Sequence, residues 1–163
     1  MMKKRWFLIF FVTAVVGTAL HFVYDLWPVP LVGIIAPVNE CVWEHLKMLY
    51  WPSLAAGFFL AREDRGSSRF WSAWLAGMLL APTALLGVYY TLLAGFGVES
   101  QAVDVALYYL SLAFGFWTAW RLNDSGKAEK LVGVLVIAAG LFGAALVLFT
   151  VCPADLPIFV SKM

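Results

Sequence analysis

Five long apolar stretches, separated by short polar connectors, most constrain what this chain can fold into. They cover residues 6–24, 39–61, 70–94, 102–120 and 131–151. A helix needs about 20 apolar residues to cross the roughly 30 Å hydrocarbon layer of a membrane. Each stretch is close to this length, so the sequence predicts an all-α, polytopic transmembrane bundle of five helices. We expect one integral membrane domain over residues 1–163.

The composition supports this class and excludes others. Only 13% of the residues are charged and 63% are hydrophobic, whereas a soluble domain carries about 25% charged residues. A soluble enzyme, a disordered chain and a nucleic-acid-binding protein are therefore excluded. The sequence has no glycine-rich phosphate loop, so we expect no nucleotide partner. Membrane lipids and a second copy of the chain are the expected partners.

The distribution of positive charge predicts the orientation. Of the eleven Lys and Arg residues, nine lie before residue 6, between residues 62 and 69, or between residues 121 and 130. These three segments share one side of a five-span bundle, and cytoplasmic loops are rich in Lys and Arg. We therefore predict a cytoplasmic N-terminus, an outer C-terminus, and a first span that is retained rather than removed as a signal peptide.

The connector between the first two spans is unusual. Pro28, Pro30 and Pro37 surround an apolar run, residues 31–36, that is too short to cross a bilayer. We expect a re-entrant or interfacial connector on the outer side. Asn39 is a typical N-cap residue, so the second helix is predicted to begin there, with Glu40 in its first turn.

Several ionisable residues lie inside the predicted spans, where they cost free energy unless they are paired or line a wet cavity. Glu44, His45 and Lys47 fall roughly 7–12 Å below Asn39 at 1.5 Å per residue. At about 100° per residue, Glu40, Glu44 and Lys47 share one stripe of the helix, and His45 lies on a neighbouring stripe. We also expect Lys47 to bond an acidic side chain.

The first span carries a matching pair. His21 and Asp25 are four residues apart, and His21 lies at nearly the same depth as Glu44 and His45. Because the two helices are adjacent and antiparallel, we predict that their polar groups face each other. His21, Asp25, Glu40, Glu44 and His45 are therefore candidate ligands of a divalent metal such as zinc, iron or manganese.

A bound metal suggests a membrane enzyme acting on a lipid-like or small amphiphilic substrate. In that hypothesis the candidate catalytic residues are Glu44, His45 and Lys47, and the candidate substrate-binding residues are Asn39, Trp43 and Tyr24. Two other functions stay open. The polar groups could form a proton or cation pathway in a carrier, or a network that fixes helix register in a non-catalytic scaffold.

The polar segment also resembles a known signature. The residues His21-Phe-x-Tyr-Asp25, followed by Pro37-Val-Asn-Glu-x-x-Trp-Glu-His-Leu-Lys47, are similar to those of an uncharacterised family of small bacterial membrane proteins. This chain departs at Cys41, where that signature has Ser. The resemblance implies a multi-span bundle in the bacterial cytoplasmic membrane and supplies no activity.

Two further groups lie near the predicted outer boundary. Cys41 and Cys152 could form a disulfide or stay as two free thiols. Four tyrosines in the third and fourth spans are predicted to lie mainly at the membrane interface, with one in reach of the polar site. These are Tyr89, Tyr90, Tyr108 and Tyr109.

Overall fold

The computed structural model describes residues 2–62 and 66–160, and these residues form helices and connecting segments without a strand. They contain six α-helices rather than the predicted five. The α-helices are α1 (Met2–Leu26), α2 (Pro30–Ile35), α3 (Val42–Ala61), α4 (Ser68–Tyr90), α5 (Gln101–Ser125) and α6 (Val132–Val151). A π-helix, η1 (Thr91–Gly95), extends α4, and the 3₁₀ turns η2 (Glu129–Leu131) and η3 (Pro157–Phe159) flank α6.

The additional helix is α2, which lies in the proline-rich connector. Pro30 occupies its first turn, where the missing N–H costs nothing. At six residues α2 is too short to cross a membrane, as predicted. The five other α-helices correspond to the five apolar stretches, although α5 continues to Ser125, five residues beyond its predicted end.

Four helical segments are long and apolar enough to cross a membrane by length and composition. They are Lys4–Leu26, Ser68–Gly95, Gln101–Ser125 and Glu129–Val151. Helix α3 has 20 residues but is not in this group, because Glu44, His45 and Lys47 in its N-terminal half lower its mean hydropathy. Most of α3 is instead buried against other helices of the chain.

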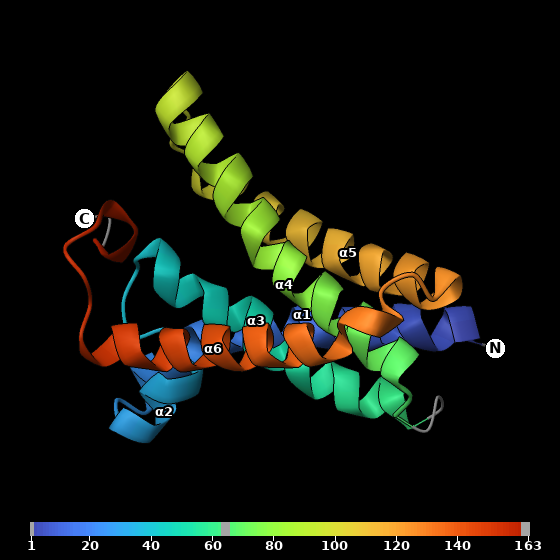
Figure 1. The fold of residues 1–163 in the computed structure, drawn as a ribbon. Coiled ribbons are helices and arrows are strands. Elements are labelled where there is room, and N and C mark those ends of the chain that lie inside the picture. Colours follow the sequence, from blue (N-terminus) through green and yellow to red (C-terminus); the bar gives the residue numbers. More distant parts are fainter. Residues whose placement is uncertain (1, 63–65, 161–163) are drawn as a thin grey trace.

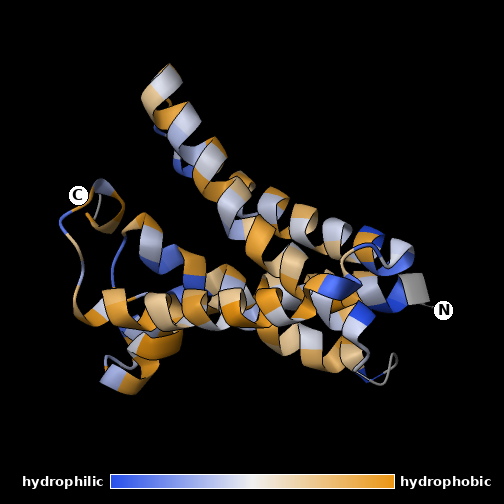
Figure 2. Ribbon diagram, in the orientation of Figure 1, coloured by the Kyte–Doolittle hydropathy of each residue, from blue (hydrophilic) through white to orange (hydrophobic). Residues whose placement is uncertain are grey.

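Helices α1, α3 and α6 run side by side along the long direction of the molecule, whereas α4 and α5 form a pair (Figure 1). This pair packs against the others near the end that holds the N-terminus and diverges from them toward the opposite end. The N-terminus and the C-terminus lie at opposite ends of the bundle. Figure 2 shows that hydrophilic residues gather near the N-terminal end, while α6 is almost uniformly hydrophobic.

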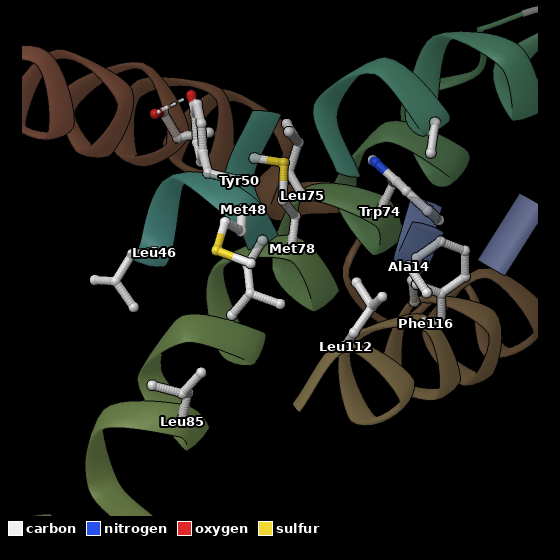
Figure 3. Close-up of a cluster of buried hydrophobic side chains, with 14 of the residues drawn as sticks. Ala14, Leu46, Met48, Tyr50, Trp74, Leu75, Met78, Leu85, Leu112 and Phe116 are labelled. Carbon is white, nitrogen blue, oxygen red and sulfur yellow. Dashed lines mark hydrogen bonds between the residues drawn. The ribbon is translucent and has the colours of Figure 1, made fainter. Parts of the chain in front are cut away.

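The core lies where α3 and α4 meet the other helices. Figure 3 shows side chains from α1, α3, α4 and α5 packed together, with a hydrogen bond from the Tyr50 hydroxyl to the Ala139 carbonyl of α6, at 2.8 Å. The Trp74 indole donates to the carbonyl of Ser53, at 3.0 Å. The Tyr50 hydroxyl and the Trp74 indole N–H therefore each have a partner, as polar groups in an apolar environment require.

Helices α4 and α5 approach each other closely because glycines face each other at their contact. A Cβ atom on Gly77 would collide with the backbone carbonyl of Gly115, and a Cβ on Gly115 would lie 2.8 Å from the carbonyl of Gly77. Small residues permit this approach, which is common between helices in membranes. The pair therefore forms one tightly packed unit.

Candidate metal site and cleft

The predicted meeting of the two polar helix faces is confirmed, with a changed membership. His21 lies near the end of α1, His45 lies in the first turn of α3, and Glu40 lies in the non-helical segment that precedes α3. One ligand atom from each of the three lies within 4.8 Å of the others. We call these three residues the His–Glu–His group.

The distances within the group suit a metal ion. The Nε2 atom of His45 lies 3.4 Å from one carboxylate oxygen of Glu40, and the Nε2 atom of His21 lies 3.8 Å from the other. In a tetrahedral zinc site with bonds of about 2.0–2.1 Å, neighbouring ligand atoms lie roughly 3.4 Å apart. The two measured separations in the group therefore equal or slightly exceed this spacing.

The ring of His45 is oriented as in many metal sites. Its Nδ1 atom lies 2.8 Å from the carbonyl oxygen of Cys41. Because a carbonyl can only accept, Nδ1 carries a hydrogen, and Nε2 is the ring nitrogen that lies on the side of Glu40. A hydrogen bond from the second ring nitrogen to a carbonyl is what metal-bound histidines usually make. The Nδ1 atom of His21 is buried without a hydrogen-bond partner.

The His–Glu–His group lines one wall of a cleft of about 690 Å³. The opposite wall comes from α4 and α5, which diverge from α1 and α3 at this end of the molecule (Figure 1). Gln101 and Asp104 supply polar atoms to the wall from α5. The volume falls in the range of sites that hold small-molecule ligands, about 300–1,000 Å³.

The inner end of the cleft is closed where α1 meets α5. The Tyr108 hydroxyl donates to the carbonyl of Ala14, at 3.3 Å, and the hydroxyls of Thr18 and Tyr109 lie 3.0 Å apart. Gly17 is required here, since a Cβ atom would collide with the Tyr108 hydroxyl. The same Cβ would lie 2.6 Å from the carbonyl of Met48, which has no helical donor because Pro52 lacks an N–H.

Glu44 does not join the His–Glu–His group but forms a buried ion pair with Lys47. The Lys47 ammonium lies 2.6 Å from the Glu44 carboxylate, which confirms the predicted acidic partner of Lys47. The two side chains are 1% and 0% exposed. The second carboxylate oxygen of Glu44 accepts a hydrogen bond from Thr150 of α6, at 2.7 Å.

This ion pair also holds the connector that carries Glu40. Lys47 donates to the carbonyls of Gly33, at 2.6 Å, and Ala36, at 3.4 Å. The Glu44 carboxylate accepts from the Val38 N–H, at 2.9 Å. Side chains of α3 thus fix the connector between α2 and α3.

The predicted N-cap at Asn39 is wrong. Helix α3 begins at Val42 with Cys41 as its N-cap residue. The Asn39 side chain accepts a hydrogen bond from the Cys41 N–H, at 3.0 Å, so it closes a turn before the helix. Glu40 therefore lies outside the helix, and its carboxylate turns toward the histidines instead of sharing a stripe with Glu44.

The other predicted site residues lie elsewhere. Asp25 is exposed near the end of α1 and lies outside the group of potential ligands found in the described part of the chain. Trp43 packs against Phe142, Phe149 and Phe159, and Tyr24 lies beside Gly33 of α2. The described lining of the cleft includes neither of these aromatic residues nor Asn39.

The sequence interpretation missed the wall from α5. Gln101, Asp104 and Tyr108 lie three and four residues apart, which places them on one helical face. This spacing could have indicated from the sequence that one face of α5 contributes to the site. Tyr89, Tyr108 and Tyr109 all line the cleft, and the first two are buried.

The two cysteines are free thiols in this structure. Cys41 is buried at the start of α3, and Cys152 is exposed after the end of α6. Burial raises the pKa of the Cys41 thiol above its usual value. Cys41 is therefore protonated at neutral pH.

The fold and its apolar helices are those of a helical membrane protein with a His–Glu–His group beside an internal cleft. The chain belongs to the family of unknown function DUF6512, whose model matches residues 1–163. No curated protein and no solved structure matches the chain.

Proposed function

We propose that this protein is a five-span enzyme of the bacterial cytoplasmic membrane that uses one divalent metal ion to act on an amphiphilic substrate. The observation that carries this proposal is the convergence of His21, Glu40 and His45 on the wall of a cleft. Two imidazoles and one carboxylate form a ligand set of catalytic zinc sites, in which a fourth position stays open for water.

The topology in this proposal adds α3 to the four helices that are apolar enough to cross a membrane. Its polar first half is compatible with a span because Glu44 and Lys47 neutralise each other inside the protein. An odd number of spans agrees with the termini at opposite ends of the bundle (Figure 1). The excess of Lys and Arg at the N-terminal end supports a cytoplasmic location for that end.

The chemistry follows from the open cleft. A divalent metal held by the His–Glu–His group would polarise a water molecule or a substrate oxygen. Asp104 on the opposite wall is positioned on the cleft as a candidate proton acceptor. His45 is a ligand in this proposal, and the Cys41 carbonyl fixes its ring.

Glu44 and Lys47 have a structural role in this proposal. Their charged atoms bond each other. Lys47 also bonds α2, and Glu44 also bonds the connector and Thr150. This arrangement also disfavours a proton pathway through Glu44, because its oxygens are occupied by three donors. Membrane lipids would contact the exposed apolar side chains of α1 and α6.

Metal analysis of the purified protein tests the proposal. The chain in detergent is equilibrated separately with Zn²⁺, Mn²⁺ or anaerobic Fe²⁺, and bound metal is measured after desalting. We expect one ion per chain, and a loss of affinity of at least about tenfold in Glu40→Gln and His45→Ala.

Asp25→Asn is the matched control, because Asp25 is an acidic residue on α1 outside the group. It should bind metal like the unmodified chain. A protein that retains no stoichiometric metal, or whose His45→Ala variant binds it equally well, would contradict the proposal.

A further inference from the structure

The lining of the cleft divides into a polar end and an apolar end. The polar end is formed by His21, His45, Gln101 and Asp104, which lie near the ends of their helices, and by Glu40, which lies just before α3. The apolar end is formed by buried side chains from α3, α4 and α5 that also line the cleft. These are Met48, Leu85, Leu107 and Tyr108.

The two ends follow each other along the helices. From Gln101 to Tyr108, α5 advances about 10 Å at 1.5 Å per residue, and from Val42 to Met48, α3 advances about 9 Å. A ligand in the cleft would therefore present its polar group to the His–Glu–His group. Its apolar part would extend toward the contact between Tyr108 and Ala14 that closes the cleft.

The cleft also has an apolar side opening. Phe22 of α1 is 56% exposed, and Val105 and Tyr109 of α5 are 50% and 40% exposed, yet all three line the cleft. Both helices belong to the segments that are apolar enough to cross a membrane. An opening between two such helices faces acyl chains rather than water.

From this division we infer that the cleft binds one alkyl chain of an amphiphile, which enters from the bilayer between α1 and α5 and places its head at the His–Glu–His group. The inference rests on the proposed function and adds that the amphiphile carries one alkyl chain and enters from the bilayer. A volume of about 690 Å³ matches a drug-sized molecule with one chain.

Hydroxamates of different chain length test this inference, because their head chelates zinc whatever the length of the tail. Binding of acetohydroxamate and octanohydroxamate to the zinc-loaded protein is measured in lipid nanodiscs. Burial of a methylene contributes about 0.8 kcal/mol, close to a fourfold gain in affinity. With three of the six additional methylenes buried, we expect octanohydroxamate to bind about 50-fold more tightly.

Leu85→Trp is the diagnostic variant, since the larger side chain fills the apolar end of the cleft. In this variant octanohydroxamate should bind less than about fivefold more tightly than acetohydroxamate. Binding of zinc and of acetohydroxamate should be unchanged. Leu80→Trp is the matched control, because Leu80 lies on the same helix, is 41% exposed and is outside the described lining. Partitioning of the tail into lipid is the same in both variants.

Val105→Trp provides a second variant at the exposed side opening, where a larger side chain does not disturb the core. It should slow association of octanohydroxamate more than that of acetohydroxamate. If zinc and acetohydroxamate bind, but Leu85→Trp keeps the full gain in affinity from chain length and Val105→Trp slows both hydroxamates equally, the chain site is refuted and the metal site stands. If neither zinc nor acetohydroxamate binds, the proposed function fails, and the inference fails with it.

Discussion

Replacement of Lys47 by Met would remove the cation from a buried ion pair while keeping a side chain of similar length. Lys47 is 0% exposed, and its ammonium bonds the Glu44 carboxylate and the Gly33 carbonyl, each at 2.6 Å. Removal of one partner from a buried pair costs about 3–5 kcal/mol, because the remaining charge is uncompensated. Glu44 keeps its hydrogen bonds from Val38 and Thr150. We therefore expect a loss of stability at the lower end of this range, about 3 kcal/mol.

The free energy of unfolding can be measured by SDS titration in mixed micelles, with tryptophan fluorescence as the signal. The double variant Lys47→Met/Glu44→Gln removes both charges and should lose less stability than Lys47→Met alone. If Lys47→Met lies within about 1 kcal/mol of the unmodified protein, or if the double variant is the less stable one, the buried pair does not hold the fold.

The same substitution should weaken metal binding, although Lys47 is not a candidate ligand. Lys47 and Glu44 fix the connector on which Glu40 lies, whereas His21 and His45 are held by helices. We expect zinc affinity to fall about tenfold, the lower range for partners that orient ligands. Unchanged zinc affinity in a folded Lys47→Met protein would show that Glu40 is positioned without the ion pair.

Three further predictions concern topology and packing. In intact cells, a membrane-impermeant maleimide should label exposed Cys152 and spare buried Cys41, whereas labelling only after lysis would reverse the predicted orientation. Gly77→Ala should lower stability by about 1–3 kcal/mol because its Cβ meets backbone, while Gly87→Ala, with open space around it, should not destabilise. Tyr50→Phe removes one interhelical hydrogen bond and should cost about 0.6 kcal/mol in SDS unfolding, with a loss above 2 kcal/mol contradicting this account.

The positions of the long helices could be predicted because membrane-spanning stretches are long and apolar. The encounter of His21 with His45 could be predicted as well, since both lie at similar depth on neighbouring helices. Helix α2 could not be predicted from the sequence in this way. Six residues between prolines give no periodic signal, and α2 is held by Lys47 from another helix.

The absence of the predicted ligand Glu44 from the His–Glu–His group has a local cause. Glu40 and Glu44 would share one face of a helix only if both were helical. Helix α3 begins at Val42, so Glu40 is not part of it. The first turn is fixed by Glu44 itself, which accepts from the Val38 N–H, and by the Asn39 turn. Such side-chain contacts depend on the path of the connector, which spacing along one helix does not specify.

In the proposed five-span topology, α3 brings its own countercharge to the translocon, because both members of its ion pair lie on it three residues apart. The Thr150 hydroxyl that completes this arrangement is synthesised about a hundred residues later. During biogenesis, α3 therefore depends on its internal pair and on α2 until α6 arrives. A ribosome-stalled chain that ends before α6 should leave the N-terminal half of α3 more accessible to proteases than the released protein does.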